Sequence, residues 1–256
     1  MLNHDMVSAL PMEIKHFIGN APLTDTSGHS GDKTYRIEST SPAYLKIGPK
    51  GKFARAAVLQ KYWGEKGLSA KVLMYVSDEK DYLITSPVAG QDGIWPAHLS
   101  APEKLATAFG ASLRMLHSQP FEDCPVDLLG NLLQESEVRA FQQWHLDDLC
   151  PFIGAASAET ARDEVRARAH LLMRDALCHG DYCLPNIMLD NWQWTGFIDI
   201  AEGGAGDHHY DIAWGLWTIM YNLKDVKYGH IFLDAYGRDA IDPDRLRICA
   251  LLASME

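Results

Sequence analysis

The pattern of apolar and polar positions divides the chain into an N-terminal part with strand-like alternation and a C-terminal part with helical spacing. Short alternating runs separated by turns fill residues 13–83, and they are Lys33–Ile37, Ala43–Ile47 and Tyr82–Thr85. Between the second and third runs, within residues 53–66, apolar residues recur near helical spacing, and they are Ala54, Val58, Leu59 and Tyr62. We therefore predict a small β-rich lobe that carries one helix.

The pattern changes at the segment Ser86-Pro87-Val88-Ala89-Gly90, which interrupts the strand-like alternation and predicts a hinge at about residues 84–90. Beyond it, one apolar face predicts a helix over about residues 102–117. That face consists of Leu105, Ala108, Phe109, Ser112, Leu113 and Leu116. Similar spacing predicts helices at about 130–145, 158–173, 210–223 and 243–253. The sequence thus predicts an α+β fold with lobes at residues 1–85 and 86–256.

Composition and charge narrow the class of partner. The 256 residues include 23 Lys and Arg against 34 Asp and Glu, which gives a formal net charge of −11. This balance argues against nucleic acid and against an anionic membrane surface, and it would attract a cationic small molecule. No apolar run reaches the roughly 20 residues of a membrane span, and the five cysteines form no C-x-x-C pair. We expect a cytoplasmic enzyme with reduced thiols.

The candidate chemistry lies in His179-Gly180-Asp181, in Asn186 and in Asp199. Transfer of a phosphoryl group from ATP requires a base beside the acceptor hydroxyl and hard oxygen ligands for Mg²⁺. Asp181 suits the first role, and Asn186 with Asp199 suits the second. A short strand from Asn186 to Leu189, a turn at Asn191 and a strand ending at Asp199 would form a hairpin that brings Asp199 beside Asn186.

The alternative is that these residues only form turns, because Asp, Asn and Gly are common in loops. Each residue taken alone favours that structural interpretation. Their order along the chain favours catalysis, because the set is followed by Gly204, Gly206, Asp207 and Asp211.

The sequence resembles the aminoglycoside phosphotransferases of the protein-kinase-like superfamily, and most closely the neomycin/kanamycin 3'-phosphotransferases. One group of matching segments is 179–188, 196–199, 204–207 and 210–213, and a second is 88–92, 98–99, 103–104, Arg114, 116–117 and 124–125. The resemblance implies a two-lobed kinase-like fold with a small β-rich N-terminal lobe for the nucleotide. The larger, mainly helical C-terminal lobe would hold the catalytic and acceptor sites. It also implies MgATP as donor and a hydroxyl of a small molecule as acceptor.

The same resemblance assigns the nucleotide contacts. Ser30, in a Gly- and Ser-containing loop before a strand, and Lys46, on the next strand, correspond to phosphate-binding residues of the family, and we add Ser86 and Val88 in the hinge. Without the resemblance, an ordinary hairpin turn is favoured for residues 27–33, and an edge-strand lysine facing water is a serious alternative for Lys46. His179 corresponds to a packing residue of the loop, and we interpret Asp207 and Asp211 as caps or loop anchors.

Two departures from the family pattern keep alternatives open. Ala56 stands where relatives have the Glu that pairs with the phosphate-binding Lys, which favours a nucleotide-binding pseudokinase. Ala253, Ser254 and Glu202 stand where relatives have acidic residues and an Arg around the acceptor, which favours a kinase for another small hydroxylated metabolite or antibiotic. As acceptor contacts we predict Asp148, Glu202, Trp217 and Glu256.

Overall fold

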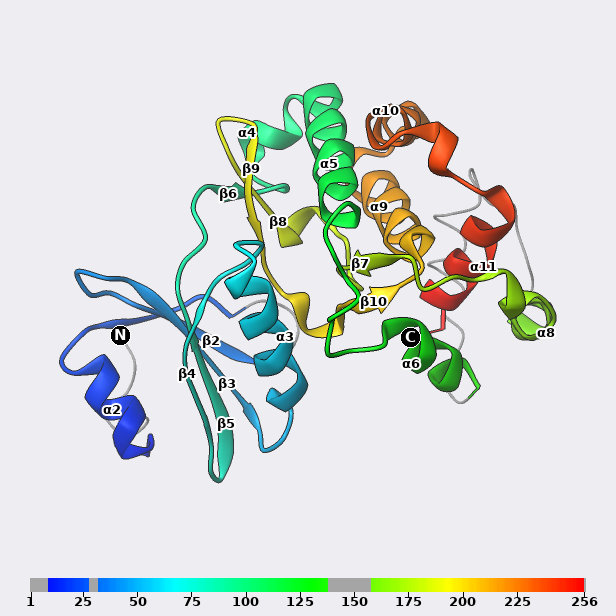
Figure 1. Ribbon diagram of the computed structural model, residues 1–256. Helices are drawn as coiled ribbons and strands as arrows, with labels where there is room; N and C mark the ends of the chain where they lie inside the picture. Colours follow the sequence, from blue (N-terminus) through cyan, green and yellow to red (C-terminus); the bar gives the residue numbers. More distant parts are fainter. Residues whose placement is uncertain (1–8, 28–31, 138–157, 256) are drawn as a thin grey trace. The chain divides into compact units, whose positions relative to one another are not determined.

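The chain forms two compact units, Met1–Val88 and Ala89–Glu256. The structure is a computed structural model that describes residues 9–27, 32–137 and 158–255. Figure 1 follows the described elements from the N-terminal to the C-terminal end of the chain.

The N-terminal unit is built on a five-stranded antiparallel sheet with the order β1-β2-β3-β5-β4. Its strands are β1 (Leu23–Asp25), β2 (Lys33–Ile37), β3 (Ala43–Pro49), β4 (Val72–Ser77) and β5 (Lys80–Thr85). The three strands predicted from alternation are present, whereas β1 and β4 were not predicted. β1 is too short to show a periodic pattern, and β4 is an edge strand in which no described side chain is buried.

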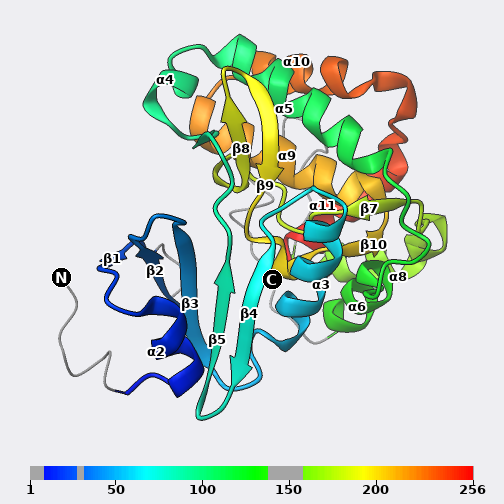
Figure 2. The same ribbon diagram turned by 60° about the vertical axis from the view of Figure 1, so that its left-hand side comes forward.

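One face of this sheet packs against the helix α2 (Met12–Ile18), as Figure 2 shows. Ile14 and Ile18 of the helix join a buried cluster with Tyr35, Ala43 and Leu45 of the sheet. Because side chains alternate between the two faces of a strand, the burial of Ala43 and Leu45 places the intervening residues of β3 on the opposite face.

The unit contains two helices rather than the one predicted, because α2 was not predicted from the sequence. The predicted helix is α3 (Ala54–Glu65), and only part of its expected apolar face is buried. Leu59 is fully buried as expected, and Trp63, one turn further on, is fully buried as well, whereas Val58 is 52% exposed and Ala54 is exposed. Gly64 lies so close to the backbone at Ala70 that an added Cβ would meet the carbonyl oxygen at 3.0 Å. The burial of Leu59 and Trp63 and the close approach of Gly64 set the orientation of the helix, and the number of apolar residues on a face does not.

The C-terminal unit is mainly helical. Its described helices are α4 (Pro96–Leu99), α5 (Pro102–His117), α6 (Leu128–Ser136), α8 (Ala158–Arg168), α9 (His208–Leu223), α10 (Val226–Tyr236) and α11 (Pro243–Ala253). α5 packs along α10, and α9 packs against α11 (Figure 1). None of the helices in the described part of the chain is long and apolar enough to cross a membrane.

The predicted helices of this unit agree with the structure at 102–117 and 243–253, and that at 210–223 begins two residues earlier, at His208. The helix expected over 158–173 ends at Arg168 and continues as the 3-10 turn Ala169–Leu171. The helix expected over 130–145 is α6 as far as Ser136, and its second half lies outside the described residues. α10 was not predicted.

Two small antiparallel sheets interrupt the helices. β7 (Ala176–Cys178) pairs with β10 (Gly204–Gly206), and β8 (Ile187–Asp190) lies between β6 (Gln91–Asp92) and β9 (Gln193–Phe197). The α+β class, with a β-rich N-terminal unit and a mainly helical C-terminal unit, is confirmed.

Candidate active site

The loop that carries Asp181 leaves the sheet directly after β7. Gly180 has a φ of +83°, and a Cβ at this position would lie 2.1 Å from the carbonyl oxygen of Glu202. Only glycine fits both the left-handed backbone and this close approach. The loop is thereby packed, backbone against backbone, on the segment that follows Asp199.

Asp181 is half-buried and is held by Asn186 within the same loop. The Asn186 side-chain Nδ2 donates hydrogen bonds to Asp181 Oδ2 at 2.8 Å and to the Asp181 backbone oxygen at 2.9 Å. Since both bonds use Nδ2, the Oδ1 atom of Asn186 points away from Asp181. The pair therefore presents one carboxylate and one amide oxygen in different directions.

The β8–β9 hairpin brings Asp199 to this pair. Ile187 is opposite Phe197, and the Ile198 N–H donates to the Asn186 carbonyl oxygen at 3.0 Å. Asp199 follows next and is exposed, with a left-handed φ of 54°. The predicted hairpin is confirmed, although Asn186 belongs to the 3-10 turn Leu184–Asn186 rather than to a strand, and β9 ends at Phe197.

His179 is fully buried and uses both ring nitrogens to hold the backbone. Its Nε2 lies 3.0 Å from the Ile198 carbonyl oxygen, which can only accept, so Nε2 carries the proton. Its Nδ1 accepts a hydrogen bond from the Asp181 N–H at 3.3 Å. His179 therefore has an architectural role and links the loops that carry Asp181 and Asp199.

Asp211, in the first turn of α9, anchors the same loop. Its carboxylate accepts hydrogen bonds from the backbone N–H groups of His179, at 2.6 Å, and Gly180, at 2.9 Å. His117 Nε2 lies 3.1 Å from Asp211 Oδ2. Asp207 caps the same helix by accepting the His209 N–H at 3.0 Å. Both aspartates have the anchoring roles interpreted from the sequence.

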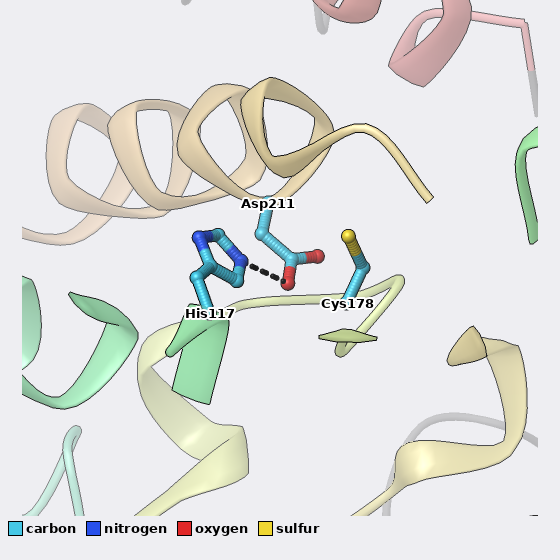
Figure 3. Close-up of side chains that lie close together, drawn as sticks. All are labelled: His117, Cys178 and Asp211. Atoms are coloured by element: carbon cyan, nitrogen blue, oxygen red, sulfur yellow. Dashed lines mark hydrogen bonds and ion pairs between the residues drawn. The ribbon is translucent and has the colours of Figure 1, made fainter. Parts of the chain in front are cut away.

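His117, Cys178 and Asp211 bring potential ligand atoms within 4.8 Å of one another, as a metal site would (Figure 3). Hydrogen bonds already engage both His117 nitrogens and both Asp211 oxygens. Burial raises the pKa of the Cys178 thiol well above its usual value, so this group is not a thiolate. The cluster is a hydrogen-bonded support for the loop. This role of His117 was not predicted from the sequence. The indication in the sequence was that residues 116–117 belong to the second group of segments that match the family.

The predicted nucleotide contacts belong to the N-terminal unit. Lys46 is half-buried on β3, opposite Thr34 and Leu83, on the sheet face away from α2. Ser86 continues the pairing of β4 and β5, because its N–H donates to the Lys71 carbonyl and its hydroxyl accepts the Lys71 N–H, both at 2.9 Å. Val88 is half-buried at the end of the unit. Ser30 lies outside the described residues.

The predicted acceptor contacts are dispersed. Glu202 is exposed in the 3-10 turn Ile200–Glu202, with its backbone against Gly180. Trp217, half-buried on α9, stacks on Tyr221 with the ring centroids 5.2 Å apart. Asp148 and Glu256 lie outside the described residues. Ala253 and Ser254 are buried, so these departures from the family pattern present no side chain at the surface.

Comparison with known proteins identifies the family of this chain. Residues 24–249 match the model of the phosphotransferase enzyme family, and the chain belongs to that family. A probable aminoglycoside 3'-phosphotransferase of Lactococcus lactis subsp. lactis (strain IL1403) is 35% identical over 244 residues, which cover 94% of this chain and 93% of the relative. A streptomycin 3''-kinase of Streptomyces griseus is 29% identical, with 90% of each chain covered.

A solved structure shares the fold. It is that of aminoglycoside phosphotransferase APH(3'')-Id from Streptomyces rimosus ATCC10970 in complex with ADP and streptomycin. It superposes with a TM-score of 0.73 at 21% identity, and 100% of this chain and 99% of that chain are covered. The kinase-like architecture expected from the resemblance is confirmed.

Proposed function

We propose that this protein transfers the γ-phosphoryl group of MgATP to a hydroxyl group of an aminoglycoside. The observation that carries the proposal is the pairing of Asp181 with Asn186 on one loop, beside the hairpin end that presents Asp199. We assign one carboxylate to the acceptor, and the second carboxylate and the amide oxygen to a cation.

The donor set at this hairpin fits Mg²⁺. Asp199 is exposed, and Asn186 turns Oδ1 away from Asp181, so each offers a hard oxygen of the kind that Mg²⁺ prefers. One carboxylate and one amide are sufficient, because Mg²⁺ retains several waters in protein sites. When bound, the ion neutralises charge on the ATP phosphates. Asn186 and Asp199 are the residues that would hold it.

The remaining residues act by position and charge. Asp181 accepts the proton of the acceptor hydroxyl and keeps that oxygen in line with the transferred group. Lys46 supplies a positive charge for the phosphate oxygens, and Ser30, Ser86 and Val88 provide further nucleotide contacts. The N-terminal unit is thus the nucleotide-binding unit, and the C-terminal unit carries catalysis and acceptor binding.

Three observations support an aminoglycoside acceptor. The two relatives reported above are named as enzymes that phosphorylate aminoglycosides. The net charge of −11 attracts polycations, and Glu202 is exposed next to the catalytic loop. Trp217, Asp148 and Glu256 complete the proposed contacts.

The burial of Ala253 and Ser254 favours a second candidate, another small hydroxylated acceptor. The four described cysteines are free and buried, which fits a cytoplasmic enzyme.

The test is an assay of ADP release with MgATP and a panel of acceptors that contains kanamycin, neomycin, streptomycin and uncharged sugars. We expect turnover with at least one aminoglycoside, and ³¹P NMR of the product identifies the hydroxyl that is phosphorylated. The Asp181→Asn variant is the matched control for contaminating kinases. Turnover with an uncharged sugar and none with any aminoglycoside would favour the second candidate.

A further inference from the structure

Tyr236, the last residue of α10, lies behind the catalytic loop and has no part in the proposed chemistry. It is 2% exposed, and its hydroxyl oxygen lies 2.9 Å from His117 Nδ1. His117, the last residue of α5, reaches Asp211 through its other nitrogen. Three helices therefore meet in one line of hydrogen bonds that ends at the backbone of the loop.

The direction of each bond in this line follows from the groups involved. The carboxylate of Asp211 accepts two backbone N–H groups and has no proton to donate. It must therefore accept from His117 as well, and the proton of the ring is on Nε2. Burial lowers the pKa of His117, and Asp211 only partly opposes that shift, so the ring is neutral and Nδ1 is an acceptor. The Tyr236 hydroxyl must then be the donor to Nδ1.

Tyr236 has an environment that keeps its hydroxyl protonated. Burial raises the pKa of Tyr236 well above its ordinary value, although nearby Arg114 partly opposes that shift. The Arg114 guanidinium lies 5.5 Å from the ring centroid, also on α5. A protonated phenol that donates to Nδ1 polarises the imidazole and strengthens the bond from Nε2 to Asp211, because hydrogen bonds in a chain reinforce one another.

We propose that Tyr236 is a positioning residue for phosphoryl transfer: by donating to His117 Nδ1, it reinforces the Nε2–H tautomer of His117 and so strengthens the grip of Asp211 on the catalytic loop. Asp211 holds the N–H groups of His179 and Gly180, and Asp181 is the next residue. The inference rests on the proposed function for its kinetic consequence, whereas the hydrogen-bond chain itself can be measured without turnover.

The test compares Tyr236→Phe, which removes only the hydroxyl, with Tyr228→Phe on the same helix. Tyr228 is half-buried, and its ring lies beside Lys227. We expect Tyr236→Phe to lower kcat about fivefold, equivalent to about 1 kcal/mol, with the KM for ATP and for the acceptor unchanged. Tyr228→Phe should leave kcat as in the wild type. Equal kcat in Tyr236→Phe and wild type would overturn the kinetic part of the proposal.

Two further measurements separate a positioning role from a general loss of stability. ¹⁵N NMR of the His117 ring should show the neutral Nε2–H tautomer in the wild-type protein, and an imidazolium or an Nδ1–H tautomer would overturn the proposal. Amide exchange at Gly180 should accelerate in Tyr236→Phe and not in Tyr228→Phe. Both readouts hold even if no acceptor is phosphorylated, so failure of the proposed function is recognised separately.

A double variant tests whether Tyr236 acts through His117. His117→Gln keeps a side-chain N–H at the position of Nε2 but breaks the covalent path from Nδ1. In that background Tyr236→Phe should cause no further loss of kcat, since coupled residues are not additive. A second fivefold loss in the double variant would show that Tyr236 acts by another route and would overturn the proposal.

Discussion

At the scale of single residues, the proposed metal ligand Asp199 gives the most direct prediction. Its side chain is exposed and its φ of 54° suits Asn as well as Asp, so Asp199→Asn should fold normally. Loss of the one charged ligand should lower Mg²⁺-dependent turnover by at least about a hundredfold. Steady-state kinetics over a range of Mg²⁺ concentrations measure this effect. Wild-type turnover in a folded variant contradicts the assignment.

Asp181 should behave differently, because its proposed role concerns the acceptor rather than the nucleotide. Asp181→Asn keeps an oxygen that can accept the hydrogen bond from Asn186 Nδ2, so the loop should keep its form. We expect kcat to fall by about 10²- to 10⁴-fold while MgATP affinity is retained. Calorimetric titration with a non-hydrolysable ATP analogue checks the affinity. If the variant binds nucleotide poorly but turns over bound substrate at the normal rate, the role assigned to Asp181 is wrong.

At the scale of elements, Gly180 joins the catalytic loop to the segment after Asp199. Gly180→Ala combines a strained φ with a clash against the Glu202 carbonyl, and it should destabilise the protein by about 3 kcal/mol or more. Gly67→Ala is the matched control, because Gly67 has a φ of +72° and no atom within 4 Å of the added Cβ. That variant should lose only about 1 kcal/mol. Urea denaturation of both variants measures the difference, and similar losses would show that strain alone limits Gly180.

The first turn of α3 gives a prediction about the nucleotide. Ala56 is half-buried there, and that turn contains no acidic residue. Ala56→Glu should form an ion pair with Lys46. It should lower the KM for ATP or raise kcat by about fivefold at most, since such an ion pair contributes about 1 kcal/mol or less. The desolvation of a new pair can leave stability level or lower.

Ala57→Glu, the next position of the same turn, is the control for Ala56→Glu. It provides the same favourable charge at the helix N-terminus but points about 100° away around the helix. Acceptor preference should stay constant in both variants. Equal kinetics in both variants and the wild type would show that Ala56 is a tolerated difference from the family and would remove the main argument for a pseudokinase.

The elements also show how far sequence reasoning reaches. Long periodic segments such as α5 and the hairpin with Asp199 were predicted because their signals are local. The short edge strands, α10 and the orientation of α3 were not, since tertiary packing decides them. The same holds within the site. Spacing pointed to Asp181, Asn186 and Asp199, whereas the support from His117 and Tyr236 depends on contacts between residues 119 positions apart.

At the scale of the whole molecule, each unit contains at least one buried aspartate whose charge is stabilised by hydrogen bonds. Burial alone would raise the pKa of Asp81, but hydrogen bonds, first that from Ser77, lower it below its usual 3.8. In the C-terminal unit, burial would likewise raise the pKa of Asp207, and hydrogen bonds, first that from His209, lower it. Burial lowers the pKa of His117 and His209 from 6.5.

All these groups make stability fall on acidification, in two stages. The unfolded chain binds protons at the histidines below pH 6.5 while the folded protein does not, so the free energy of unfolding begins to fall there. The aspartate contribution is complete above pH 3.8 and is lost as the pH falls through the lowered folded-state pKa. Urea denaturation of the wild-type protein at pH 7, 5 and 3 should therefore show a fall in each interval.

Asp81→Asn tests the second stage in the N-terminal unit. The Asp81 carboxylate accepts hydrogen bonds from Phe53 N–H at 2.7 Å and from the Ser77 hydroxyl at 2.7 Å, and an Asn side chain would turn an N–H group toward one of these donors. We expect a loss of about 2 kcal/mol at pH 7 that becomes smaller at pH 3, where the Asp81 carboxyl of the unfolded wild-type chain is protonated. Asp78→Asn, at an exposed position in the same β4–β5 turn, should leave the free energy of unfolding unchanged at both pH values. An equal loss at pH 7 and pH 3 would mean that the shape of the Asp81 side chain, rather than its charge, stabilises this unit.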